Sequence, residues 1–197
     1  LEGRALRQGD ALAALPANEG ELQEGAIVTP LLERPSEGVR VVLGPQDDYF
    51  TPEAIATFFA EPYALSARFD RMGCWLEGPP LAHAGGFDIV SDGIALGAIQ
   101  VPGSGQPVVL LRDHQSTGGY PKLGALARAD VGAFAQHRPG ERVRFAACGV
   151  DAARAALLAV WAALDAPLEL RSLRGEVPAE LLHANNLIGG VVDGSSW

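Results

Sequence analysis

The chain has 197 residues, of which 48% are hydrophobic and 20% are charged, as is typical of a globular protein. Its net charge of −9 comes from 24 acidic and 15 basic side chains, and it argues against nucleic acid as a partner because phosphate binding needs a basic face. No apolar run is long enough to cross a bilayer, so we expect no membrane partner.

The first 37 residues differ in composition from the rest of the chain. Residues 1–26 mix Leu and Ala with Gly, Asn and Glu without a sustained period, and residues 30–38 have the Pro, Ser, Glu and Gly content of a linker. A clear β pattern begins at Val39. We therefore expect residues 1–37 to be the remnant of an N-terminal part with its linker, and residues 38–197 to form one domain.

Mainly extended segments fill the middle of the chain. We expect strands over 39–43, 98–101, 107–111, 123–129 and 142–146, two further extended segments within 63–76, and a strand with a turn over 87–93. Thr51 followed by Pro52 and Glu53 predicts a helix to about residue 60, since a hydroxyl N-cap, a first-turn proline and an acid all favour a helix start.

Two further helices are expected after residue 129. Asp130 should cap a short helix over 131–136, and Asp151 should cap a longer one. Ala153, Leu157 and Trp161 share one stripe of that longer helix with Leu164, so we expect it to pack on the barrel or on a partner. Residues 181–192 suggest a short helix or turn that leads into a strand.

Frequent turns and short strands indicate the fold class. With 24 Gly and 14 Pro and only a few convincing helices, the sequence predicts a mainly β protein, a barrel or a sandwich, with a few short helices and a C-terminal helix.

The two cysteines and four histidines give no sign of a metal site. Cys74 and Cys148 are too few and too far apart for a disulfide framework or a zinc ligand set, and the histidines lie in unrelated contexts. We expect both cysteines to be buried hydrophobes, no metal ligands, and a cytoplasmic location.

Residues 97–122 combine turns with side chains suited to anion chemistry. Backbone amides at Gly118 and Gly119, with the ammonium of Lys122, suit a developing oxyanion, and the hydroxyls of Thr117 and Tyr120 can orient it. Gln100 and Gln106 flank the connection between the two strands and can hydrogen-bond an amide. An ordinary hairpin with a solvated loop remains the alternative. The spacing is not that of a Walker A motif.

Two other polar clusters have both structural and functional interpretations. Arg68, Asp70 and Arg71 are either a surface ion-pair cluster or a group that grips a carboxylate. Ser91 and Asp92 are either an Asx-type turn or substrate ligands next to the central stretch.

Five ordered motifs resemble one known family. The runs are RFDRMG at 68–73, LEGP at 76–79, IVSDG at 89–93, GAIQVPGSGQP at 97–107 and TGGYPK at 117–122. Together they resemble the allophanate hydrolase subunit 2 family, also called the biotin-dependent carboxyltransferase family, over residues 1–150. The resemblance implies a cyclophilin-like β-barrel. Because members of that family are longer at the N-terminus and this chain opens on Leu1, we expect it to be a C-terminal portion.

The resemblance also implies a function in a multi-subunit complex. We expect a subunit of an ATP-dependent amide-hydrolysing complex that converts 5-oxoproline to glutamate, as the C subunit of 5-oxoprolinase does. One alternative is the biotin-dependent carboxyltransferase part of a urea amidolyase or allophanate hydrolase system. The other is a non-catalytic regulatory or interaction subunit similar to the kinase-A-inhibitor-like members.

Site residues, cofactors and partners are implied by the same resemblance. The expected catalytic residues are Lys122, Tyr120 and Asp70, and the expected substrate-binding residues are Arg68, Arg71, Gln100, Gln106, Thr117, Gly118, Gly119, Ser91 and Asp92. We expect no tightly bound cofactor, ATP handled by partner subunits, and biotin if the reaction is carboxyl transfer. The expected partners are an allophanate hydrolase subunit 1-like protein, a 5-oxoprolinase A-like subunit, and a small amide or ureido substrate.

Overall fold

A computed structural model of the chain describes residues 7–13, 25–27, 37–166 and 170–172. The described residues divide into two units, one with residues 7–13, 25–27 and 170–172 and the other with residues 37–166. In the first unit, β1 (Gly25–Ile27) pairs antiparallel with β12 (Leu170–Ser172). Residues 30–36 of the linker predicted over 30–38, and the elements predicted over 181–192, lie outside the described residues. The predicted domain boundary after residue 37 stays a prediction.

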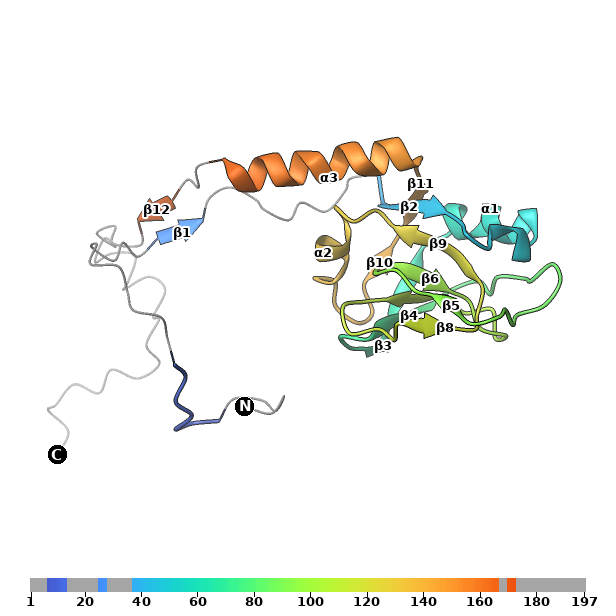
Figure 1. The fold of residues 1–197 in the computed structure, drawn as a ribbon, viewed down its shortest axis with the longest axis horizontal. Helices are drawn as coiled ribbons and strands as arrows, with labels where there is room; N and C mark the ends of the chain where they lie inside the picture. The colour runs from blue at the N-terminus through green and yellow to red at the C-terminus, as the bar shows by residue number, and fades with distance from the viewer. Residues whose placement is uncertain (1–6, 14–24, 28–36, 167–169, 173–197) are drawn as a thin grey trace, which may run out of the picture. The chain divides into compact units, whose positions relative to one another are not determined.

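The second unit contains the remaining elements in chain order (Figure 1). They are β2 (Val39–Leu43), a 3₁₀ turn (Asp47–Tyr49), α1 (Pro52–Ala60), β3 (Tyr63–Phe69), β4 (Gly73–Glu77), β5 (Asp92–Gly93), β6 (Ala98–Gln100), β7 (Val108–Leu110), β8 (Thr117–Gly118), β9 (Lys122–Leu126), α2 (Val131–Phe134), β10 (Arg142–Val143), β11 (Phe145–Ala147) and α3 (Val150–Asp165).

An eight-stranded sheet forms a nearly closed barrel. Its strand order is β10-β3-β4-β7-β6-β9-β2-β11, so β10 and β11 are the two outermost strands. Only Arg144 separates them in sequence, because β10 ends at Val143 and β11 begins at Phe145. The chain therefore links the two edges of the sheet through a single residue, which holds the barrel nearly closed. The predicted mainly β class is confirmed.

Aromatic side chains fill the barrel beneath α1. Phe58 is fully buried, and its ring stacks on Phe145 at 4.7 Å between centroids. Tyr63, also fully buried, contacts Phe58 and donates its hydroxyl hydrogen bond to the Pro79 carbonyl at 2.9 Å. The predicted start of α1 is confirmed, since Thr51 Oγ1 accepts the backbone N–H of Ala54. The amphipathic helix thus seals one side of the core.

Of the two helix caps predicted after residue 129, one is correct in position only and the other is wrong. Asp130 is the N-cap residue of α2, but its side chain makes no capping hydrogen bond, because its buried carboxylate accepts the backbone N–H and the guanidinium of Arg40 instead. An unpaired carboxylate in the core would cost more free energy than a capping hydrogen bond gains, so the Asp130 side chain pairs with Arg40 instead of capping the helix. The N-cap of α3 is Gly149, and Asp151 lies inside the first turn.

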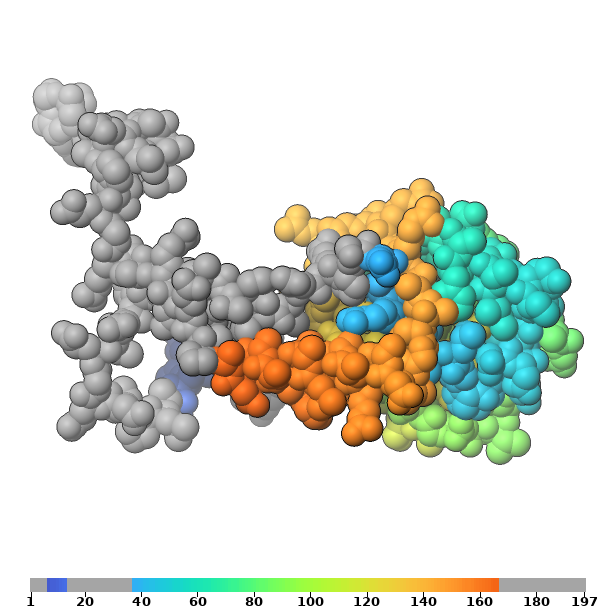
Figure 2. Space-filling view, turned by 90° about the horizontal axis from the view of Figure 1, so that it is seen from above, coloured from blue at the N-terminus to red at the C-terminus, as the bar shows by residue number. Residues whose placement is uncertain are grey.

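One further prediction needs correction, and one stays open in part. On α3, Trp161 is 54% exposed and Leu164 is 52% exposed, and much of the helix is in view in Figure 2. These two stripe residues do not pack on the barrel, and packing of the helix on a partner stays a prediction. The extended segment expected over 87–93 forms a strand only at Asp92–Gly93. In the parts of the chain that the structure describes, no helix has the length and apolarity to span a bilayer.

Candidate functional site

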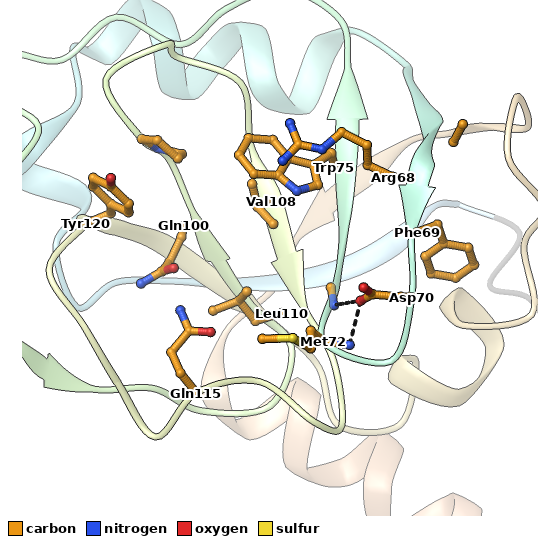
Figure 3. A pocket seen from close by; sticks show the side chains of 13 residues that line it. Arg68, Phe69, Asp70, Met72, Trp75, Gln100, Val108, Leu110, Gln115 and Tyr120 are labelled. Carbon is orange, nitrogen blue, oxygen red and sulfur yellow. Dashed lines mark hydrogen bonds between the residues drawn. The ribbon is translucent and has the colours of Figure 1, made fainter. Parts of the chain in front are cut away.

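A cavity of 540 Å³ opens beside β4, β6 and β7, and residues from several loops complete its wall (Figure 3). Four of the predicted site residues line it, namely Arg68, Asp70, Gln100 and Tyr120. Its size lies within the range of about 300–1,000 Å³ that small-molecule sites occupy. The strand order β3-β4-β7-β6-β9 brings these residues to one face, since Arg68 and Asp70 come from the end of β3 and the turn after it, and Gln100 and Tyr120 from β6 and the loop before β9.

One wall carries a cation stacked on an indole. The guanidinium carbon of Arg68 lies 4.0 Å from the ring centroid of Trp75. Figure 3 shows the two side chains side by side, with Gln100, Gln115 and Tyr120 on the other side of the cavity. A guanidinium held over an aromatic face keeps its N–H edge available for a carboxylate. Trp75 and Gln115 were not predicted as site residues.

Lys122 is buried next to the cavity residues and pairs with Asp92. Its side chain is 4% exposed, whereas that of Asp92 is 52% exposed, and Nζ lies 3.2 Å from Oδ2 of Asp92. The pKa of Asp92 lies below its ordinary value, chiefly because of the Lys122 ammonium and then because the Gly93 N–H and the Gln46 amide donate to the carboxylate. Lys122 is also the only lysine in the sequence.

Two buried nitrogen atoms at this place lack an aligned hydrogen-bond acceptor. They are Nζ of Lys122 and Nε2 of Gln100, on residues that are each 3% exposed. Gln100 and Lys122 are register partners on β6 and β9, and directly opposed side chains lie on the same face of a sheet. Buried donors without acceptors are costly, so the pair is suited to a ligand oxygen.

Gly118 lies directly against the amide of Gln100. A Cβ atom on Gly118 would lie 2.6 Å from Nε2 of Gln100 and 2.8 Å from Cδ1 of Ile94. Gly118 also pairs with Asp92 in the two-stranded β5–β8 ladder, which sets the carboxylate over Lys122. A side chain at this position would therefore displace the amide of Gln100.

Gln46 joins the Lys122–Asp92 pair, although we did not predict it. Its Oε1 accepts the Lys122 backbone N–H at 3.1 Å, its Nε2 donates to Oδ2 of Asp92 at 3.4 Å, and its backbone N–H donates to the Lys122 carbonyl at 3.2 Å. Gln46 lies in the turn after β2, and the composition of that turn indicates only that the strand ends. A polar side chain shortly after a strand was the one feature of the sequence that could have pointed to this residue.

Asp70 has a structural task in the β3–β4 turn. Its Oδ1 accepts the backbone N–H groups of Met72 at 2.7 Å and Gly73 at 3.1 Å (Figure 3). A carboxylate used in this way fixes a turn, as Asx turns do. Its predicted catalytic role stays a prediction.

The remaining predicted residues lie outside the lining of this cavity. Arg71 forms a two-point ion pair with exposed Asp113, with Nε to Oδ2 at 2.8 Å and Nη2 to Oδ1 at 3.1 Å. Gln106 donates from Nε2 to the Gly78 carbonyl at 3.2 Å, and its buried Oε1 has no hydrogen-bond partner. Neither residue touches the Lys122 group, so their predicted roles in substrate binding stay predictions.

The rest of the Gly-Gly loop is used for pairing. The Gly119 carbonyl accepts the Ile89 N–H at 2.8 Å, and a Cβ on Gly119 would lie 3.9 Å from Oγ of Ser91. Thr117 is exposed and pairs with Gly93 in the β5–β8 ladder. Ser91 and Thr117 therefore flank the ladder that carries Asp92. Among the described residues, no group of three His, Cys, Asp or Glu side chains is placed to hold a metal ion.

Known proteins share this sequence and fold. The chain is 34% identical to the C subunit of 5-oxoprolinase from Escherichia coli over 153 residues, which cover 78% of this chain and 48% of the relative. It is 28% identical to urea amidolyase of Saccharomyces cerevisiae over 174 residues, covering 77% of this chain and 9% of that protein. The chain thus spans about half the length of the 5-oxoprolinase subunit that it matches.

Solved structures agree with the sequence matches. The crystal structure of the Kluyveromyces lactis urea amidolyase has a TM-score of 0.65 and 27% identity, covering 79% of this chain and 10% of that one. The K. lactis urea carboxylase has a TM-score of 0.61 and 27% identity, covering 64% and 12%. The family model described as "Carboxyltransferase domain, subdomain A and B" matches residues 1–147. The chain therefore belongs to the carboxyltransferase domain family, as its motifs suggested.

Proposed function

We propose that this chain is part of a subunit that binds a small amide within an ATP-dependent 5-oxoprolinase complex, where the lactam of 5-oxoproline is opened to glutamate. The observation that carries the proposal is a pair of buried donors with hydrogen-bonding capacity left over: Nε2 of Gln100 has no acceptor, and Nζ of Lys122 has three N–H groups but only Asp92 as a neighbouring carboxylate among the described residues. The 34% identity to the C subunit of 5-oxoprolinase supports this choice of substrate.

The two donors suit the chemistry of an amide carbonyl. When a nucleophile adds to the amide carbon, negative charge gathers on the carbonyl oxygen, and preorganised donors in a buried site stabilise it. Lys122 supplies the positive charge and Gln100 a neutral N–H. Asp92 holds the ammonium in place from the solvent side, because its Oδ2 lies 3.2 Å from Nζ. Companion subunits supply the ATP chemistry.

Arg68 is suited to the carboxylate of 5-oxoproline. Its guanidinium lies over Trp75 in the cavity, and a guanidinium binds a carboxylate at two points. Tyr120 also lines the cavity and is 42% exposed, so its hydroxyl is available to orient the substrate. The cavity therefore offers separate groups for the two ends of one small molecule.

A carboxyltransferase acting on urea is the second candidate, and similarity to urea amidolyase favours it. A ureido oxygen of biotin fits the same donors, since Nε2 of Gln100 has no acceptor and Nζ of Lys122 has N–H groups left beyond its pair with Asp92. Biotin would supply the carboxyl group to be transferred. A binding-only subunit is the third candidate, and a cytoplasmic location is part of the proposal for all three.

Reconstitution with the companion subunits tests the proposal. The complex should release glutamate from 5-oxoproline only when ATP is present, and Lys122→Ala should abolish this release while the complex still assembles. Carboxyl transfer from carboxybiotin to urea, with no glutamate release, would replace the proposal with the second candidate. Turnover that Lys122→Ala leaves unchanged would leave this chain as a scaffold.

A further inference from the structure

A second cavity, of 450 Å³, lies at one end of the barrel. It shares only Phe69 and Asp70 with the first cavity among the residues that line each. The topology explains its position: β7 and β9 both run antiparallel to β6, so both strands end on the same side of the sheet. Arg112 and Arg128 each follow one of these strand ends by two residues and therefore flank the start of β6.

The floor of this second cavity is apolar. Leu111 is 5% exposed and Val131 is 8% exposed, and the partly buried side chains of Leu96 and Phe69 pack against the same core. Val131 opens α2, which follows β9 and forms one wall. An apolar hollow of this volume is suited to the hydrocarbon part of a small ligand.

The mouth of the second cavity is positively charged. Arg71, Arg112 and Arg128 line it, and Arg71 is already paired with Asp113. Asp70 also lines the cavity, but its Oδ1 accepts the backbone N–H groups of Met72 and Gly73. Arg112 and Arg128 are exposed and have no carboxylate partner within the described ranges. Two unpaired arginines are notable in a chain with 24 acidic side chains against 15 basic ones. The charge at the mouth is complementary to an anionic head group.

We propose that the second cavity binds an apolar carboxylate, with the carboxylate on Arg112 and Arg128 and an alkyl chain over Leu96, Leu111 and Val131. A small molecule is the proposed occupant, because a volume of 450 Å³ lies within the range of small-molecule sites. The proposal does not depend on the proposed reaction, and the two cavities have only Phe69 and Asp70 in common.

Titration of the full chain with a series of straight-chain carboxylates from butyrate to decanoate tests the site. Binding, followed by calorimetry and by the NMR signals of the ligand, should saturate at one molecule per chain and tighten about fourfold for each added methylene. The double variant Arg112→Gln, Arg128→Gln should weaken octanoate binding at least tenfold. Arg138→Gln, which changes an exposed arginine outside the cavity, is the matched control and should leave binding unchanged.

Three results would overturn the proposal. One is the absence of saturable octanoate binding, and another is equal binding of octanol and octanoate, which would remove any role for the charge. The third is unchanged affinity in the double variant when its thermal unfolding matches that of the parent protein. If an acidic peptide bound while octanoate did not, the cavity would be assigned to a protein partner instead.

Discussion

Replacing Lys122 by methionine tests whether its ammonium acts in catalysis without disturbing the folding of the chain. Methionine keeps an unbranched side chain of similar length but removes the ammonium, in a place where the lysine side chain is only 4% exposed. The carboxylate that remains, Asp92, is 52% exposed and regains water. We therefore expect the free energy of unfolding to change by less than about 1 kcal/mol.

Turnover should respond far more strongly than stability. Loss of one preorganised donor from an oxyanion site costs about 10²–10³-fold in rate, or about 3–4 kcal/mol of transition-state stabilisation. Lys122 supplies the charged member of the two buried donors, so the Lys122→Met complex should lose turnover by this factor. Substrate binding through Arg68 should change less, which places the loss in kcat more than in KM.

The assay compares glutamate release by the reconstituted complex with urea unfolding of the isolated chain. Arg142→Met is a matched control, since it removes an exposed cation at the barrel edge. A Lys122→Met protein that folds, assembles and turns over within threefold of the parent would refute the reasoning. Because Lys122 is the only lysine in the sequence, Nζ gives a single side-chain ammonium signal by which NMR can check its ion pair directly.

Three further outcomes are expected from the geometry around Asp92, Gly118 and Tyr63. Gln46→Met removes a donor to Asp92, so the pKa of that carboxyl should rise toward its ordinary value. The acid limb of the plot of turnover against pH should then move to higher pH, and a limb that does not move would contradict the role of Gln46 in lowering the Asp92 pKa. Gly118→Ala should lower turnover about tenfold by displacing the neighbouring amide, whereas Gly93→Ala, whose Cβ meets nothing within 4 Å, should not. Burial raises the pKa of Tyr63 to about 12, so ultraviolet titration should find its phenol still protonated above the ordinary tyrosine pKa. The free energy of unfolding should fall as the pH rises from the ordinary tyrosine pKa to about 12, and Tyr63→Phe should remove this fall.

Local sequence patterns predicted elements whose causes are local. The start of α1 was correct because a hydroxyl cap, a proline and an acid act within four residues. The strand at Val39–Leu43 was also correct, since alternating apolar residues between turn residues leave few other choices. Asp130 was correctly placed at the N-cap of α2, but its side chain makes no capping hydrogen bond because it pairs with Arg40, which lies 90 residues away in sequence.

The chain by itself determined which chemistry is present, and the tertiary structure decided which residues share a site. The sequence singled out Lys122, Gln100, Gly118 and Asp92, and five ordered motifs identified the family. Only strand register could place Gln100 opposite Lys122, and only the fold could bring in Gln46, whose partners lie 46 and 76 residues away in sequence. Hydrogen-bond partners at such separations are set by barrel closure, which a local pattern does not encode.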